Sequence, residues 1–291
     1  MTNSLARIVS IASKYIPLIK TIPPLATTLA AEFAALDQVV AVALAGSRSQ
    51  NVSDDRSDYD FYVYVKKDIP VEIRAAIAKP FAERIEINNQ FWETGDEWID
   101  LKSGFGVDVM YRTPQWIEEQ LSRILVNHQA SIGYSTCFWW NILTSVCLYD
   151  ADGWFKQLQK KVNQPYPEPL KQAIIAKNYP ILRHTISAYT HQLKLAIYRK
   201  DAISVMHRTT ALLESYFDII FAINAVPHPG EKRILEQVIN LCPKVPDGIE
   251  EEIYNITNAL SSPPTLIAHI NRLIDGLEQL LIVEGYIKQS N

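Results

Sequence analysis

Two neighbouring stretches decide the fold: VVAVALAGS at residues 39–47 and SDYDFYVYV at residues 57–65. The first is a short run rich in Val and Ala, which predicts a buried strand that ends at a Gly-Ser pair. The second alternates along its length, so Asp58 and Asp60 project from the same face of a second strand. The mostly polar segment 48–57 between them predicts a loop.

The carboxylates of this region indicate a metal site. Asp58 and Asp60 repel each other unless a cation joins them, and Mg²⁺ is the simplest ion that takes carboxylate oxygens as ligands. Asp108 lies inside the apolar, strand-like segment GVDVMYR, where an ionised side chain is costly unless it faces the same metal. Gly46 and Ser47 supply backbone N–H groups and a hydroxyl, which suit a phosphate if a short helix begins there.

The residues around these stretches mix helices and strands. A proline begins a helical pattern over 24–36, and a second helical pattern ends at Pro80. Strand-like segments follow at 84–92 and 106–112, and the polar segment 93–104 separates them. These patterns predict a mixed sheet with flanking helices.

Beyond Pro114 the sequence is helical almost throughout, and 134–150 has the pattern of one largely apolar helix. The helical period, with a break at Pro180, covers 168–200, 201–225, 231–241, 249–260 and 264–288. The chain is therefore expected to be an α+β protein. Residues 1–115 would form the domain with the mixed sheet, and 116–291 an all-helical bundle. A cleft between the two domains is the expected place for a ligand.

Composition narrows the class of protein. The 28 Lys and Arg against 32 Asp and Glu give a net charge of -4, so no binding of duplex DNA through a broad basic face is expected. No segment reaches the roughly 18 uninterrupted apolar residues of a membrane span, so no membrane partner is expected. Residues 1–20 are predicted to form an amphipathic helix. Cys137, Cys147 and Cys242 form no CxxC pair, which favours a reducing cytoplasm.

The motifs LAGS at 44–47, SDYDFYV at 57–63 and VDV at 107–109 together resemble the nucleotidyltransferase superfamily related to DNA polymerase β. That superfamily combines a hydrophobic strand, Gly-Ser, a spacer of about this length, Asp-x-Asp on the next strand and a third Asp on a later strand. The lincosamide and aminoglycoside nucleotidyltransferases are the most similar branch, because a helical C-terminal domain follows a minimal catalytic domain in them as well. Segments 164–170 and 215–233 also look like a bacterial branch of the superfamily.

The resemblance implies a minimal nucleotidyltransferase domain followed by a helical acceptor-binding domain. It implies that the protein transfers a nucleoside monophosphate from an NTP, such as ATP, to a hydroxyl of a small antibiotic-like acceptor, with release of pyrophosphate. In that scheme Asp58 and Asp60 hold two Mg²⁺ ions and Asp108 binds the catalytic one. The residues implied for the phosphates are Gly46, Ser47 and Arg48.

Three residues of the helical half are further candidates. Glu214 and Asp218 lie four positions apart on one face of the helical segment 201–225, where they would line the acceptor site or act as general base. Lys232 lies in HPGEKR (228–233), which predicts a helix start whose first turn meets the triphosphate. For all three the alternative is a solvated helix face.

Two other classes of function remain open. The first is a protein nucleotidylyltransferase of the antitoxin type, although such proteins tend to be short single domains. The second is a nucleotide-binding protein that has lost catalysis, although the complete set of Asp58, Asp60 and Asp108 argues against it. Pyrophosphate release with Mg²⁺, measured over the four NTPs and a panel of acceptors, would separate these classes.

Overall fold

The chain forms two compact units in a computed structural model that describes residues 21–49, 57–91, 93–260 and 263–289. The first unit comprises residues 1–122 and 138–165, and the second comprises 123–137 and 166–291. The chain thus passes between the units three times, instead of once at the expected boundary near residue 115. The amphipathic helix expected over 1–20 lies outside the described residues.

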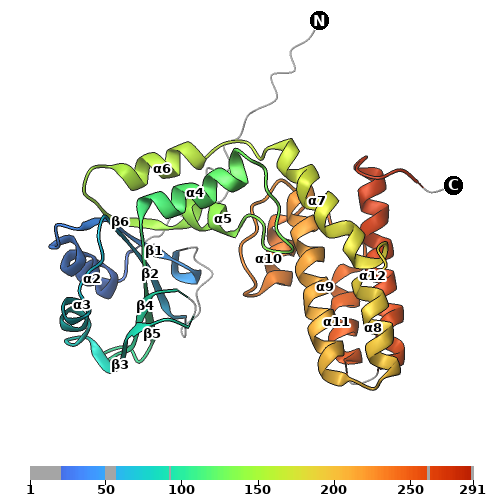
Figure 1. The fold of residues 1–291 in the computed structure, drawn as a ribbon, viewed down its shortest axis with the longest axis horizontal. Helices are drawn as coiled ribbons and strands as arrows, with labels where there is room; N and C mark the ends of the chain where they lie inside the picture. The colour runs from blue at the N-terminus through green and yellow to red at the C-terminus, as the bar shows by residue number, and fades with distance from the viewer. Residues whose placement is uncertain (1–20, 50–56, 92, 261–262, 290–291) are drawn as a thin grey trace, which may run out of the picture. The chain divides into compact units, whose positions relative to one another are not determined.

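A mixed six-stranded sheet with the order β3-β4-β5-β2-β1-β6 forms the centre of the first unit (Figure 1). The strands are β1 Val39–Ala45, β2 Tyr59–Val65, β3 Ala82–Asn89, β4 Gly95–Asp100, β5 Gly106–Arg112 and β6 Val146–Asp150. The strands β2 and β5 run parallel, and the other neighbouring pairs run antiparallel. With the helices described below, this sheet confirms the predicted α+β class.

One face of the sheet packs against α2 (Pro24–Ala34) and α3 (Val71–Ala78), which Figure 1 shows along the same side. Alternate residues of a strand point to opposite faces, so Phe61 and Val63 of β2 point toward these helices. They are fully buried in one apolar core with residues of β1, β5 and α2. The opposite face of β2 therefore carries Asp60 and the tyrosines that follow it.

Helices α4 (Pro114–Leu125), α5 (Cys137–Thr144) and α6 (Trp154–Val162) supply partners for that second face. The Tyr62 hydroxyl accepts a hydrogen bond of 3.0 Å from Asn141 Nδ2 of α5. The Tyr64 ring lies 5.1 Å from the Trp154 ring of α6. Tyr62 and Tyr64 lie two and four residues beyond Asp60 along β2, so these helices pack on the part of the face beyond the carboxylates.

Strand β4 lies within the polar segment 93–104, for which no strand was predicted. Asp96 of β4 points toward the core and is only 1% exposed. Its carboxylate accepts hydrogen bonds from the Tyr111 hydroxyl (2.6 Å) and the Asn88 N–H (2.8 Å), and it lies 3.5 Å from the Arg74 guanidinium. With these partners a buried carboxylate can lie within a strand. The polar sequence of this segment therefore gives no indication of the strand.

Strand β6 corrects the prediction of one helix over 134–150. Helix α5 ends at Thr144, and the next five-residue strand pairs with β1. The hydroxyls of Thr144 and Ser145 donate to the carbonyls of Trp140 (2.9 Å) and Asn141 (2.6 Å), which satisfies the last turn of α5. An apolar run suits a buried helix or a buried strand equally, and here the free edge of β1 decides for a strand.

The second unit is helical, as predicted for this part of the chain. Its helices are α7 Glu168–Arg183, α8 Tyr189–Tyr198, α9 Ala202–Ile223, α10 Ile234–Leu241, α11 Ile249–Ala259 and α12 Pro263–Val283. The predicted break at Pro180 is wrong, because Pro180 lies inside the last turn of α7. Among the described residues no helix combines the length and apolar character needed to cross a bilayer.

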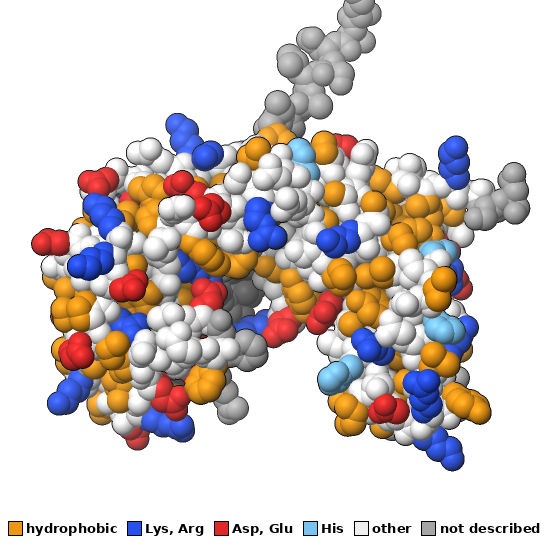
Figure 2. Space-filling model, in the orientation of Figure 1, with side chains coloured by type: hydrophobic (Ala, Val, Ile, Leu, Met, Phe, Trp, Pro, Cys, Tyr) orange, Lys and Arg blue, Asp and Glu red, His pale blue; other side chains and the backbone are white. Residues whose placement is uncertain are grey.

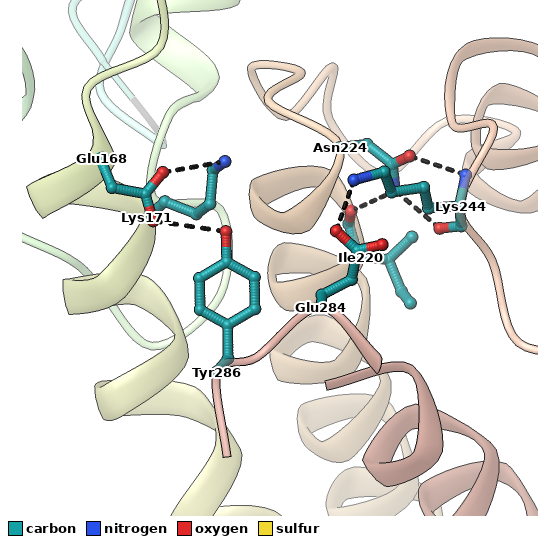
Figure 3. A network of polar contacts seen from close by, with 7 residues as sticks. All are labelled: Glu168, Lys171, Ile220, Asn224, Lys244, Glu284 and Tyr286. Atoms are coloured by element: carbon teal, nitrogen blue, oxygen red, sulfur yellow. Dashed lines mark hydrogen bonds and ion pairs between the residues drawn. The ribbon is translucent and has the colours of Figure 1, made fainter. Parts of the chain in front are cut away.

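Polar contacts connect segments of the second unit that are far apart in sequence (Figure 3). The Tyr286 hydroxyl donates to Glu168 of α7 (3.3 Å), which also pairs with Lys171. Asn224, which follows α9, donates to the Lys244 carbonyl (2.7 Å) and accepts from the Lys244 N–H (2.8 Å). The Lys244 ammonium pairs in turn with Glu284. These contacts join the chain after α12 to α7 and to the end of α9.

Candidate functional site

Three acidic residues form a row across the second face of the sheet. Asp60 of β2 lies opposite Asp108 of β5, and Asp108 lies opposite Glu97 of β4. Residues directly opposite each other share a face, and neighbouring strands lie about 4.8 Å apart. All three side chains are half-buried. The tertiary structure therefore brings together two of the three predicted aspartates, although 48 residues separate them in sequence.

Glu97 was not among the predicted site residues. It lies in the polar segment 93–104, where no strand was predicted, so nothing placed its side chain on a face of the sheet. The alternation in β4 is nevertheless visible once the strand is known, because Asp96 and Trp98 point to the core and Glu97 points away from it. Its position opposite Asp108 adds a third carboxylate to the row.

Gly46 lies against the Asp60 carboxylate at the end of β1. Its φ of 65° is in the left-handed region that favours glycine. A Cβ atom at this position would lie 1.8 Å from Asp60 Oδ2. The glycine of the Gly-Ser pair thus gives the carboxylate room to lie over the backbone. A residue with a Cβ atom at the end of β1 would therefore force the Asp60 carboxylate to shift.

The segment after Gly46, where a short helix would have favoured a phosphate, forms only a three-residue 3₁₀ turn, Ser47–Ser49. Ser49 closes this turn, because its hydroxyl donates to the Gly46 carbonyl at 2.7 Å. A turn this short has no developed helix dipole. The phosphate contacts expected of Gly46 and Ser47 would therefore come from the individual N–H and hydroxyl groups.

Asp58 lies just before β2 and contacts the start of β5. Its Oδ1 accepts a hydrogen bond of 3.1 Å from the Gly106 N–H. A Cβ atom on Gly106 would lie 2.6 Å from the same oxygen, so a second glycine makes room for a carboxylate. The Asp58 side chain is exposed. It therefore lies next to the first residue of β5, two residues before Asp108.

Arg48 binds the loop that leads into β2. Its Nε donates to the carbonyls of Ser57 (2.7 Å) and Asp58 (3.2 Å). Its guanidinium lies 4.0 Å from the centre of the Tyr59 ring and 5.1 Å from that of Phe105. These contacts orient the residues around Asp58. They give Arg48 a positioning role in addition to the predicted phosphate contact.

The donor chemistry of the row suits a hard divalent cation. Asp60 and Asp108 offer carboxylate oxygens from adjacent strands, and two like charges held this close favour a cation between them. Within the described ranges no group of three or more His, Cys, Asp or Glu side chains is assembled closely enough to hold a metal. The convergence of Asp58, Asp60 and Asp108 on one ion therefore stays a prediction.

Lys232 lies in the second unit, outside the helix that was expected to contain it. The helix α10 begins at Ile234, and Arg233 before it has a φ of 53°. Lys232 is exposed in the preceding turn, and its carbonyl accepts a hydrogen bond of 2.9 Å from Gln237 Nε2. Its ammonium makes no ion pair with any residue that the structure describes. A phosphate contact by this side chain stays a prediction.

Glu214 and Asp218 of α9 differ in environment. Glu214 is half-buried next to Gly133, and burial and the nearby Glu231 both raise its carboxyl pKa. Asp218 is 1% exposed and accepts hydrogen bonds from the Ser135 N–H (3.1 Å) and hydroxyl (2.6 Å). Asp218 therefore holds the 131–136 loop against α9, and Glu214 is the more accessible of the two carboxylates.

We expect Asp218 to make the stability of the protein depend on pH. Burial raises its pKa from 3.8 to about 7, although the hydrogen bonds from Ser135 oppose the rise. Between about pH 4 and 7 the unfolded chain loses this proton while the folded chain keeps it, so the free energy of unfolding falls as pH rises. The loss is about 4 kcal/mol, and it is complete above about pH 8. In Asp218→Asn this part of the pH dependence should disappear.

Urea unfolding at pH 5, 6, 7 and 8 measures this difference. Asp247→Asn is the matched control, because it removes an exposed carboxylate from the same unit. It should unfold with the pH profile of the unmodified protein. A profile of Asp218→Asn that runs parallel to the unmodified one would show that Asp218 is ionised at all these pH values.

Comparison with known proteins gives distant likenesses in structure. No protein-family model matches the chain, and no curated protein sequence matches it. The chain is similar to a nucleotidyltransferase-like protein from Exiguobacterium sibiricum (13% identity, TM-score 0.40), over 90% of this chain and 76% of that one. It is similar to the CCA-adding enzyme of Thermotoga maritima complexed with tRNA (12%, TM-score 0.35), over 93% and 68%. It is also similar to a spectinomycin adenyltransferase from Enterococcus (13%, TM-score 0.27), over 83% and 92%.

Proposed function

We propose that this protein is a metal-dependent nucleotidyltransferase that moves a nucleoside monophosphate from an NTP to a hydroxyl of a small acceptor. The observation that carries the proposal is the position of Asp60 opposite Asp108, with Gly46 of the Gly-Ser pair against the Asp60 carboxylate. This places the carboxylates and the glycine turn of the sequence motif at one end of β2. Carboxylates gathered in this way suit the binding of a metal ion that assists a reaction of a polyphosphate.

The residues of this chain have separate tasks in the proposed reaction. Asp60, Asp108 and Asp58 would together hold Mg²⁺. The ion would neutralise charge on the phosphates and lower the pKa of the acceptor hydroxyl. Ser47 and the N–H groups near Gly46 would bind the phosphates. Arg48 positions the backbone around Asp58. Pyrophosphate is the leaving group.

Glu97 is a candidate for binding or deprotonating the acceptor hydroxyl. It lies in the same row as Asp108, and no other described residue pairs with its carboxylate. A carboxylate next to the metal-binding pair is suitably placed to accept a proton from an attacking hydroxyl. Glu214 is the candidate for contact with a cationic group of the acceptor, since its half-buried carboxylate is accessible.

The proposal is tested by pyrophosphate release from each of the four NTPs, with and without Mg²⁺. The acceptor panel should contain aminocyclitols, lincosamides, short RNAs and purified proteins, so that the class of acceptor is tested in the same experiment. Release that requires Mg²⁺, an acceptor and an intact Asp108 would support the proposal. Binding of NTP without turnover on any acceptor would favour the nucleotide-binding alternative.

Lys232→Ala should weaken binding of MgATP about ten- to a hundredfold while the fold stays intact. One charge-assisted contact to a phosphate contributes roughly 1.5–3 kcal/mol. Isothermal titration of ATP with Mg²⁺ measures the effect. Lys79→Ala is the control, because Lys79 is also an exposed lysine, at the end of α3. Equal affinity of the Lys232 variant and the unmodified protein would remove Lys232 from the site.

A further inference from the structure

The end of the helical unit where α8 turns into α9 exposes apolar and basic side chains together. We call this surface the α8–α9 tip, and its residues are Lys194, Leu195, Tyr198, Arg199, Lys200, Ile203 and Met206. Tyr198 is 86% exposed, Ile203 65% and Met206 52%. Figure 2 shows mostly blue and orange side chains at this lower end of the helical unit.

The helical period places these residues on the outside of the unit. On α8 the exposed positions Lys194, Leu195 and Tyr198 lie on one face, while Leu193 and Ala196 are buried on the other. On α9 Ile203 and Met206 are exposed, and Val205 is buried. The apolar side chains of the tip therefore keep between 39% and 86% of their surface exposed, outside the buried core of the unit.

Basic residues outnumber acidic ones on this surface. Residues 194–206 contain three Lys and Arg and one acidic residue, Asp201, whereas the whole chain has more acidic than basic residues. The Asp201 carboxylate accepts hydrogen bonds from the N–H (3.0 Å) and hydroxyl (2.6 Å) of Ser204. Among the described residues, Lys194 and Lys200 take part in none of the ion pairs, and Arg199 interacts electrostatically with the neighbouring Asp201. The tip is thus a cationic surface on an acidic protein.

We propose that the α8–α9 tip docks on the surface of an anionic lipid bilayer. Lys and Arg near such a surface are attracted to anionic headgroups, and aliphatic and aromatic side chains enter the boundary between headgroups and acyl chains. The phosphates of a nucleic acid would explain Arg199 and Lys200, but they offer no apolar environment for Ile203 and Met206. The excess of negative charge on the rest of the chain orients the tip toward the membrane.

This proposal revises one expectation from the sequence. The expected absence of a membrane partner rested on the lack of a segment long enough to span a bilayer. A protein that lies on the surface needs no such segment. It needs only a local patch in which apolar and basic residues alternate, and the turn between α8 and α9 produces that patch.

Flotation of the full-length protein with vesicles tests the proposal. One set of vesicles contains 30% phosphatidylglycerol in phosphatidylcholine, and the other contains phosphatidylcholine alone. The protein should float with the first set at 0.1 M salt, and 0.5 M salt should release most of it. The double variant Arg199→Glu/Lys200→Glu should lower the partition coefficient at least about 30-fold. Ile203→Ser/Met206→Ser should lower it about tenfold.

Two controls keep the test specific. Lys160→Glu/Lys161→Glu makes the same change in charge on the exposed side of α6, and it should float like the unmodified protein. Circular dichroism establishes that every variant keeps its helices. Three results would overturn the proposal: no flotation with the anionic vesicles, an equal loss in the α6 variant, or unchanged flotation of Ile203→Ser/Met206→Ser. In the last case, tight binding of a single-stranded RNA through the tip would assign the surface to phosphate polyanions instead.

Discussion

Asp60→Asn is expected to lower the rate of nucleotidyl transfer by about 10²–10³-fold and to leave the fold unchanged. Asp60 lies opposite Asp108 on the parallel strands β2 and β5. Its carboxylate is therefore one of the two that would hold the metal. Asn keeps the shape of the side chain, which still fits against Gly46, but it lacks the negative charge. The rate of pyrophosphate release at saturating NTP and Mg²⁺ measures the loss.

The matched control for this change is Asp37→Asn. Asp37 is an exposed carboxylate just before β1, at the opposite end of that strand from Gly46. Its variant should keep the rate of the unmodified protein. If Asp60→Asn retained more than about a tenth of the rate, the row of carboxylates would not be the catalytic centre. Asp108→Asn would then be expected to be equally harmless.

Gly46→Ala is expected to produce a comparable loss of transfer and a lower free energy of unfolding. The added Cβ would lie 1.8 Å from Asp60 Oδ2, so the carboxylate has to move out of its position. The backbone φ of 65° adds strain for any residue with a Cβ. Together the displacement and the strain should cost about 2–4 kcal/mol. Denaturant unfolding and the pyrophosphate assay measure the two effects.

Gly153→Ala separates the strain of the backbone from the displacement of Asp60. Gly153 also has a left-handed backbone, with a φ of 74°, but its nearest neighbour to an added Cβ is Gln157 Nε2 at 3.7 Å. This variant should lose only about 1 kcal/mol of stability and none of its activity. An active Gly46→Ala variant would mean that Asp60 can leave its place without consequence, which contradicts its proposed role.

Residue patterns in the sequence were sufficient to predict the central strands of the sheet. Alternation and apolar runs predicted β1, β2 and β5 and the aspartates on them, because these strands pack an apolar face on a core. They failed for β4 and β6. In β4 the core-facing Asp96 has hydrogen-bond partners on other strands, and in β6 an apolar run of four residues before Asp150 suits either secondary structure.

The candidate site shows the same division. The sequence by itself determined which residues carry charge next to a Gly-Ser turn, since local alternation decides on which face of its own strand a side chain lies. Only the tertiary structure decided which strands lie side by side, and so which charged residues become neighbours. The parallel pairing of β2 with β5 brings Asp60 to Asp108, and the pairing of β5 with β4 adds Glu97. Asp218 is buried and Glu214 is half-buried, although both lie on α9. Strand pairing and burial depend on contacts between residues far apart in the chain, and no local pattern encodes them.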